Sequence, residues 1–187
     1  LGAWAPVIGA LFCFAFLTNV DLILVKHYFR AERAGMYAAA SVLGKALLFF
    51  PTSVALVLFP LVPRSSERIS RHTVGRALIL AGGGLGLGAA LLLLFPEFLL
   101  RAIFGPMYSD AADVLRWFGI AVPPYGLAYV VVHYHLARWR YKFLYPMALA
   151  CASEVALIGT FHGDILQVVR AFAGVGYGLL LAFMCTP

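Results

Sequence analysis

Four ionisable residues of this sequence lie inside long apolar segments: Asp21, Lys45, Glu154 and Arg170. A charged side chain at the middle of a bilayer costs at least about 2.5 kcal/mol on insertion scales, so it normally has a charged partner or lines a hydrated cavity. The two cations suit an anionic substrate, whereas Asp21 and Glu154 are candidates to exchange a proton or to bind Na⁺ as a coupling ion. These residue types indicate binding and transport, not the making of covalent bonds.

The helices that must hold these residues are predicted by composition and by the length of the apolar segments. Of the 187 residues, 63% are hydrophobic and 12% are charged, whereas about a quarter of the residues of soluble domains are charged. We therefore expect an all-α membrane protein, a bundle of about six transmembrane helices that forms a single domain over residues 1–187. The expected spans are residues 1–26, 35–62 with a kink near Pro51, 77–95, 111–136 or 117–136, 143–161 and 165–187. Residues 97–104, which end at Gly105-Pro106, are expected to lie along the membrane interface.

Basic residues at the ends of the apolar segments predict the orientation, because Lys and Arg accumulate in cytoplasmic loops. The loops after the second and fourth spans hold the larger set: Arg64, Arg68, Arg71, Arg76, Arg138, Arg140 and Lys142. The opposite side holds Lys26, Arg30, Arg33 and Arg101, and also Arg116 if the fourth span begins late. We therefore expect the first set in the cytoplasm, with both ends of the chain. Because the basic residues form no single tract, the net charge of +6 does not indicate nucleic-acid binding.

With this orientation, the four intramembrane charges fall at two depths, counted at the rise of an α-helix. Asp21 and Arg170 lie about 6 and about 7.5 Å below the outer surface, where an ion pair, a snorkelling side chain and a functional role all remain open. Lys45 and Glu154 both lie about 15 Å deep, near the midplane. The midplane position favours a hydrated internal cavity for Lys45 and Glu154.

Two other motifs have structural interpretations. His133 and His135 are two residues apart, so on a helix they point to different sides and do not form one metal site. The glycines of residues 82–88 form small-xxx-small patterns, which indicate close helix packing within the bundle. No catalytic motif, metal site or cofactor site is predicted, so we expect no enzyme activity and no cofactor.

The order of several short motifs resembles that of polysaccharide and oligosaccharide flippases of the multidrug/oligosaccharidyl-lipid/polysaccharide exporter superfamily. The motifs are Asn19-Val20-Asp21 with Lys26, Ala34-Gly35-Met36-Tyr37-Ala38-Ala39 with Leu43-Gly44-Lys45, Phe59-Pro60, Pro96 with Phe104-Gly105, Tyr108 and Ala112, and Tyr134-His135-Leu136-Ala137. The resemblance runs from about residue 15 to about residue 140. The last fifty residues carry no matching motif, so the roles of Glu154 and Arg170 rest on their depth alone.

The resemblance implies a fold with two six-helix lobes around a central cavity, of which this chain would be the second, C-terminal lobe. The missing N-terminal lobe of the same protein and the lipid bilayer would be its partners, together with a lipid-linked anionic sugar as substrate. The predicted cavity residues are Asn19, Asp21, Tyr37, Lys45 and Arg170. The predicted activity is alternating-access export across the cytoplasmic membrane. Alternatives are a multidrug or cation antiporter of the same superfamily and a structural or enzymatic membrane subunit.

Overall fold

The computed structural model describes residues 4–58, 67–139 and 141–185, and every regular element in this part of the chain is a helix. No β-strand occurs in these ranges, as predicted. The helices are α1 (Ala5–Leu17), α2 (Val20–Tyr28), α3 (Ala31–Ala46), α4 (Phe49–Leu58), α5 (Glu67–Leu94), α6 (Pro96–Phe104), the 3₁₀ helix η2 (Pro106–Ala111), α7 (Ala112–Ala137), α8 (Leu144–Thr160) and α9 (Ile165–Cys185).

Within the described ranges, five helical segments are long and apolar enough to cross a membrane, which makes the chain a multi-pass membrane protein. They are Ala5–Tyr28, Ala31–Val57, His72–Leu94, Pro106–Ala137 and Ile165–Met184. The remaining predicted span, residues 143–161, corresponds to α8, which is apolar but has only 17 residues. At the rise of an α-helix, 17 residues cover about 25 Å, less than the hydrocarbon core of about 30 Å. The predicted count of six full spans is therefore met by five, with α8 shorter than expected.

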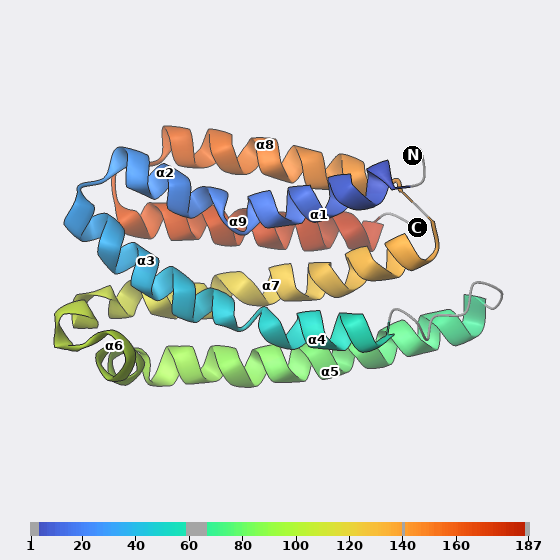
Figure 1. Ribbon diagram of the computed structural model, residues 1–187, viewed down its shortest axis with the longest axis horizontal. Helices are drawn as coiled ribbons and strands as arrows, with labels where there is room; N and C mark the ends of the chain where they lie inside the picture. The colour runs from blue at the N-terminus through green and yellow to red at the C-terminus, as the bar shows by residue number, and fades with distance from the viewer. Residues whose placement is uncertain (1–3, 59–66, 140, 186–187) are drawn as a thin grey trace.

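The long helices run along the bundle axis, and α7 lies at the centre (Figure 1). Helix α7 packs against α9 on one side and against α3, α4 and α5 on the other, whereas α8 packs against α1, α2 and α9. Helix α6 is seen nearly end on in Figure 1, so it runs across the end of the bundle as the interfacial prediction requires. Gly105, with φ of 96°, ends this helix in a conformation that favours glycine.

The ends of the bundle agree with the predicted grouping of the loops. In Figure 1, the start of α1 and the end of α9 lie at the same end of the bundle as the end of α7 and the start of α5, opposite α6. The α2–α3 and α8–α9 connections lie at the α6 end. Arg64 and Arg140 are outside the described residues, as are the side chains of Arg68 and Arg71. The start of α5 and the end of α7, which flank the two predicted basic loops, thus share one end of the bundle, and which end faces the cytoplasm stays a prediction.

The first two spans are each interrupted near their middle. The second is broken at Leu47–Leu48, where the turn is held by hydrogen bonds of the shorter i to i+3 type, from the Leu47 amide to the Gly44 carbonyl and from the Leu48 amide to the Lys45 carbonyl. Pro51 has no amide hydrogen for the carbonyl four residues before it, which is that of Leu47. The kink predicted near Pro51 is therefore confirmed, one turn before the proline itself.

The first span is interrupted at Thr18–Asn19, which the sequence analysis does not predict. The Thr18 hydroxyl donates to the Phe14 carbonyl at 2.9 Å, and the Asn19 side-chain amide donates to the Ala15 carbonyl at 2.8 Å. Such short polar side chains compete with the backbone for helix carbonyls and often bend helices. The interruption starts a new helix, α2, just before Asp21.

Two glycines of the 82–88 segment permit the close packing that the sequence predicts. A Cβ atom at Gly84 would collide with the Phe50 ring, and one at Gly88 would collide with the Leu47 side chain. Gly83 and Gly86 have open space at the same position. Gly84 and Gly88 therefore allow α5 to pack closely against the region around the α3–α4 break. This agrees with the structural interpretation of the glycine segment.

Candidate functional site

The carboxylate of Asp21 is the centre of a buried polar cluster between the first two spans. Asp21 has no exposed surface. Its Oδ2 atom accepts a hydrogen bond from the Tyr37 hydroxyl at 2.7 Å, and Lys45 Nζ contacts Oδ1 at 2.7 Å and Oδ2 at 2.8 Å. Both carboxylate oxygens are thus satisfied, by one ammonium and one hydroxyl, which is the condition for burying a charge at tolerable cost.

The helix interruptions place each charge of the pair at a favourable helix end. Asp21 is in the first turn of α2, and Lys45 is in the last turn of α3. A helix has a partial positive charge at its N-terminus and a partial negative charge at its C-terminus, so both side chains interact favourably with their own helix. The breaks at Thr18–Asn19 and Leu47–Leu48 therefore help to stabilise charges that lie inside the full spans.

Aromatic rings surround the other side of the Lys45 ammonium. Its Nζ lies 5.6 Å from the centroid of the Phe118 ring and 5.3 Å from that of Phe172, distances at which a cation is attracted by the ring faces. The rings come from α7 and α9, and the carboxylate of Asp21 comes from α2. Residues of three other spans therefore surround the Lys45 ammonium. The Lys45 side chain retains 14% of its exposure, whereas Asp21 retains none. Lys45 is thus the more exposed member of the pair.

Glu154 of α8 belongs to the same region and has no partner of its own. It is fully buried, and neither carboxyl oxygen has a hydrogen bond. Helix α8, which carries Glu154, packs against α2, which carries Asp21. An ionised carboxylate without a partner is very costly in such a place. The cluster therefore contains two carboxyl groups and one ammonium. Since the ammonium is paired with Asp21, Glu154 needs a proton or another cation to be neutral.

The structure corrects the grouping by depth. Counting residues places Asp21 at the depth of Arg170 and Lys45 at the depth of Glu154, whereas the observed ion pair joins one residue of each group, Asp21 and Lys45. Arg170 is exposed, and its guanidinium lies 4.9 Å from the centre of the Trp117 ring. Asn19 is also exposed and uses its amide on the Ala15 carbonyl. Roles for Asn19 and Arg170 in substrate binding stay predictions.

Phe118, Phe172 and Tyr125 are the parts of the site that the sequence analysis misses. Tyr125 stacks on Phe172 at 4.4 Å between ring centres and donates a hydrogen bond to the Phe172 carbonyl at 2.9 Å. Phe118 and Tyr125 are seven residues apart and so lie on one face of α7. This spacing marks a buried helix face, but no signal in the sequence separates these rings from the chain's other aromatic residues.

The described residues contain no group of three or more His, Cys, Asp or Glu side chains placed to hold a metal ion. His133 and His135 each direct Nδ1 at the carbonyl four residues earlier in α7. Comparisons with protein-family models, curated proteins and solved structures find no match to this chain. The candidate site is thus defined by its own chemistry: a buried ion pair, a tyrosine hydroxyl and an unpartnered carboxyl among membrane-spanning helices.

Proposed function

We propose that this chain is one lobe of a membrane exporter that moves a lipid-linked oligosaccharide or polysaccharide precursor across the cytoplasmic membrane by alternating access. The observation that carries the proposal is the Asp21–Lys45 ion pair, buried at a break in each of two spans and joined by Tyr37. Ionisable groups inside membrane spans mark substrate and ion pathways, and interrupted helices commonly form the binding sites of transporters. The substrate class rests on the motif resemblance, and the proposal involves no covalent change.

The pair supplies a mechanism with two states. In the state described here, Lys45 is neutralised by Asp21. In the substrate-bound state, the ammonium of Lys45, whose side chain is the more exposed of the two, turns to an anionic group such as the pyrophosphate of a lipid-linked sugar. Asp21 then keeps its hydrogen bond to Tyr37 and takes a proton or another cation. A second lobe packed on this one would complete the cavity and alternate its opening.

Glu154 favours a second candidate, a multidrug or cation antiporter. With Glu154, the carboxyl groups of the cluster outnumber the one ammonium, and the Glu154 oxygens have no hydrogen bond. Such a site suits a cationic substrate or a coupling proton or Na⁺, for which Asp21 and Glu154 are the candidate ligands. The two candidates differ in cargo, so vesicles loaded with a fluorescent lipid-linked oligosaccharide or with a cationic dye distinguish them.

The decisive test uses the full-length protein in reconstituted vesicles. The variant Lys45→Ala should abolish export of the lipid-linked sugar, and Lys45→Arg should retain much of it because the charge remains. Since Lys45→Ala also leaves Asp21 unpaired, the neutral pair Asp21→Asn with Lys45→Met is the sharper variant. It should insert and fold but transport nothing. Normal export by the neutral pair would show that the charges serve assembly alone and would remove the proposal's main support.

A further inference from the structure

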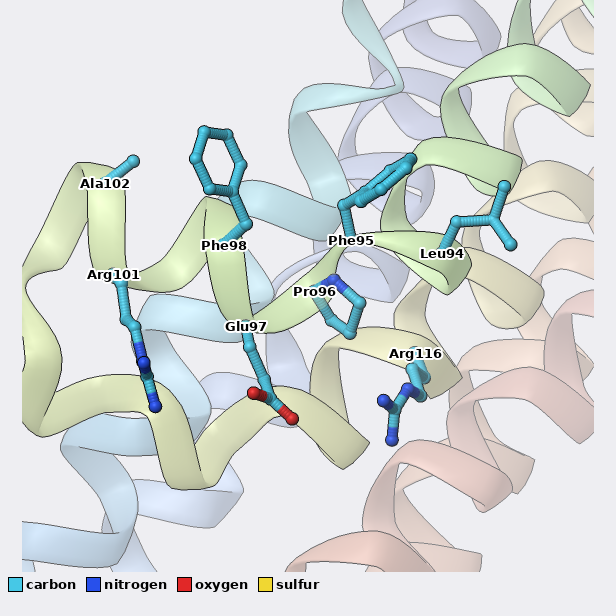
Figure 2. A pocket seen from close by; sticks show the side chains of 8 residues that line it. All are labelled: Leu94, Phe95, Pro96, Glu97, Phe98, Arg101, Ala102 and Arg116. Atoms are coloured by element: carbon cyan, nitrogen blue, oxygen red, sulfur yellow. The ribbon is translucent and has the colours of Figure 1, made fainter.

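A pocket of about 650 Å³ lies at the α6 end of the bundle, separate from the buried cluster. It forms where α5 ends, α6 crosses and α7 begins, and its lining includes Glu97, Arg101 and Arg116 together with Leu94, Phe95 and Phe98 (Figure 2). This volume is within the range of small-molecule sites. The α5 span ends at Leu94 and α6 runs across the bundle end, so in a bilayer crossed by this span the pocket is expected at the depth of lipid headgroups.

The pocket presents one free charge of each sign. Within the described part of the chain, neither Glu97 nor Arg101 has a hydrogen bond or an ion pair, whereas Arg116 is paired with Asp113 at 2.7 Å. Glu97 and Arg101 are one helical turn apart and therefore neighbours on the surface of α6. In Figure 2 both side chains point to the same side of α6, and Glu97 lies between Arg101 and Arg116 in that view.

The opposite side of the pocket is apolar and exposed. Phe98 points away from Glu97 and Arg101 in Figure 2, and the exposed fractions of Leu94 and Phe98 are 71% and 70%. Exposed apolar residues beside a charged strip are typical of helices that lie in the membrane interface. A ligand here would meet charges with its polar end and hydrocarbon with the other.

We propose that this pocket binds an amine-bearing zwitterionic phospholipid, with Arg101 on the phosphate and Glu97 on the ammonium. The two charges of such a headgroup are joined by a short ethylene bridge and match the neighbouring Arg101 and Glu97 in sign and closeness. A purely anionic headgroup would leave Glu97 beside a negative charge. A choline headgroup has no N–H to donate to the carboxylate. The acyl chains would cover Leu94, Phe95 and Phe98.

Native mass spectrometry of the purified full-length protein tests the site. The detergent-solubilised protein is titrated with phosphatidylethanolamine, phosphatidylglycerol and phosphatidylcholine that carry the same acyl chains. Phosphatidylethanolamine should bind about fivefold tighter than either of the others, since an exposed ion pair contributes up to about 1 kcal/mol. Equal binding of the three lipids, or preference for phosphatidylglycerol, overturns the proposal.

Variants assign the two contacts. Glu97→Gln should remove the preference for phosphatidylethanolamine, and Arg101→Gln should weaken binding of all three lipids because each has a phosphate. Glu32→Gln and Arg33→Gln, exposed charges at the start of α3 on the same end of the bundle, are matched controls and should change nothing. All four positions are exposed, so folding is expected to persist. An unchanged lipid preference in Glu97→Gln, or equal losses in the control variants, overturns the assignment.

Discussion

Removing one member of the Asp21–Lys45 pair should destabilise the protein strongly, and removing both should cost no more than removing one. Asp21→Asn leaves the Lys45 ammonium among Phe118 and Phe172 without an anion. Breaking a buried pair in this way costs about 3 to 5 kcal/mol. Lys45→Met leaves the fully buried carboxylate with Tyr37 alone, and we expect a similar loss.

The double variant separates a real interaction from two independent effects. If the losses were independent, Asp21→Asn with Lys45→Met would cost about 6 kcal/mol, whereas we expect about 3 kcal/mol because no charge remains buried. The coupling energy of about 3 kcal/mol exceeds the average of about 0.6 kcal/mol for hydrogen bonds between membrane helices. The reason is that both Asp21 oxygens contact the ammonium, at 2.7 and 2.8 Å.

The assay is the free energy of unfolding of the purified full-length protein in lipid bicelles, measured by steric trapping. The chain offers a matched control in the Asp113–Arg116 pair, which has the same separation of 2.7 Å but side chains that are 69% and 45% exposed. Asp113→Asn should cost less than about 1 kcal/mol. Additive losses at positions 21 and 45, or losses no larger than that of Asp113→Asn, would refute the view that a buried ion pair holds the first two spans together.

Three further predictions follow from single contacts. Tyr37→Phe removes a hydrogen bond to a buried carboxylate and should reduce the free energy of unfolding by about 1.5 to 3 kcal/mol, and an unchanged value would contradict that bond. Gly176→Ala places a Cβ 2.5 Å from the Tyr125 ring and should cost about 1 to 3 kcal/mol in the same assay, whereas Gly174→Ala, with open space, should be neutral or stabilising. Lys142→Cys should be shielded from an impermeant thiol reagent added to intact cells, whereas Arg33→Cys should react, and the reverse pattern would invert the orientation.

The sequence predicts the helices of this protein well because each helix is determined mainly by the residues of its own segment. Apolar stretches of membrane length leave the backbone no partner but itself, so the predicted spans that begin at residues 77 and 165 are helical, as α5 up to Leu94 and as α9 from Ile165 to Cys185. Gly105 and Pro51 likewise act on their own turns and mark the end of α6 and the break before α4. The interruption at Thr18–Asn19 is missed because it depends on hydrogen bonds from the Thr18 and Asn19 side chains to carbonyls of the preceding turn of helix.

The partner of each buried charge was not predictable in the same way. Depth counted along the chain assumes straight helices perpendicular to the membrane, but α3 runs obliquely to α5 in Figure 1 and both early spans are broken. Asp21 lies seven residues before the end of α2 at Tyr28, about 10 Å along the helix, whereas Lys45 lies 14 residues after Ala31, about 21 Å. Tilt and the length of the lysine side chain nevertheless bring them into contact.

The ion pair has a consequence for how the chain enters the membrane during synthesis. Asp21 and Lys45 are 24 residues apart and belong to consecutive spans, so they can meet as soon as the second span has emerged from the ribosome. A helical hairpin that carries a neutralised pair partitions into lipid more readily than either helix with its charge alone. Glu154 joins the cluster only after more than a hundred further residues have been made, when α8 packs against α1 and α2. The first two spans can thus form a stable insertion unit on which the later helices assemble.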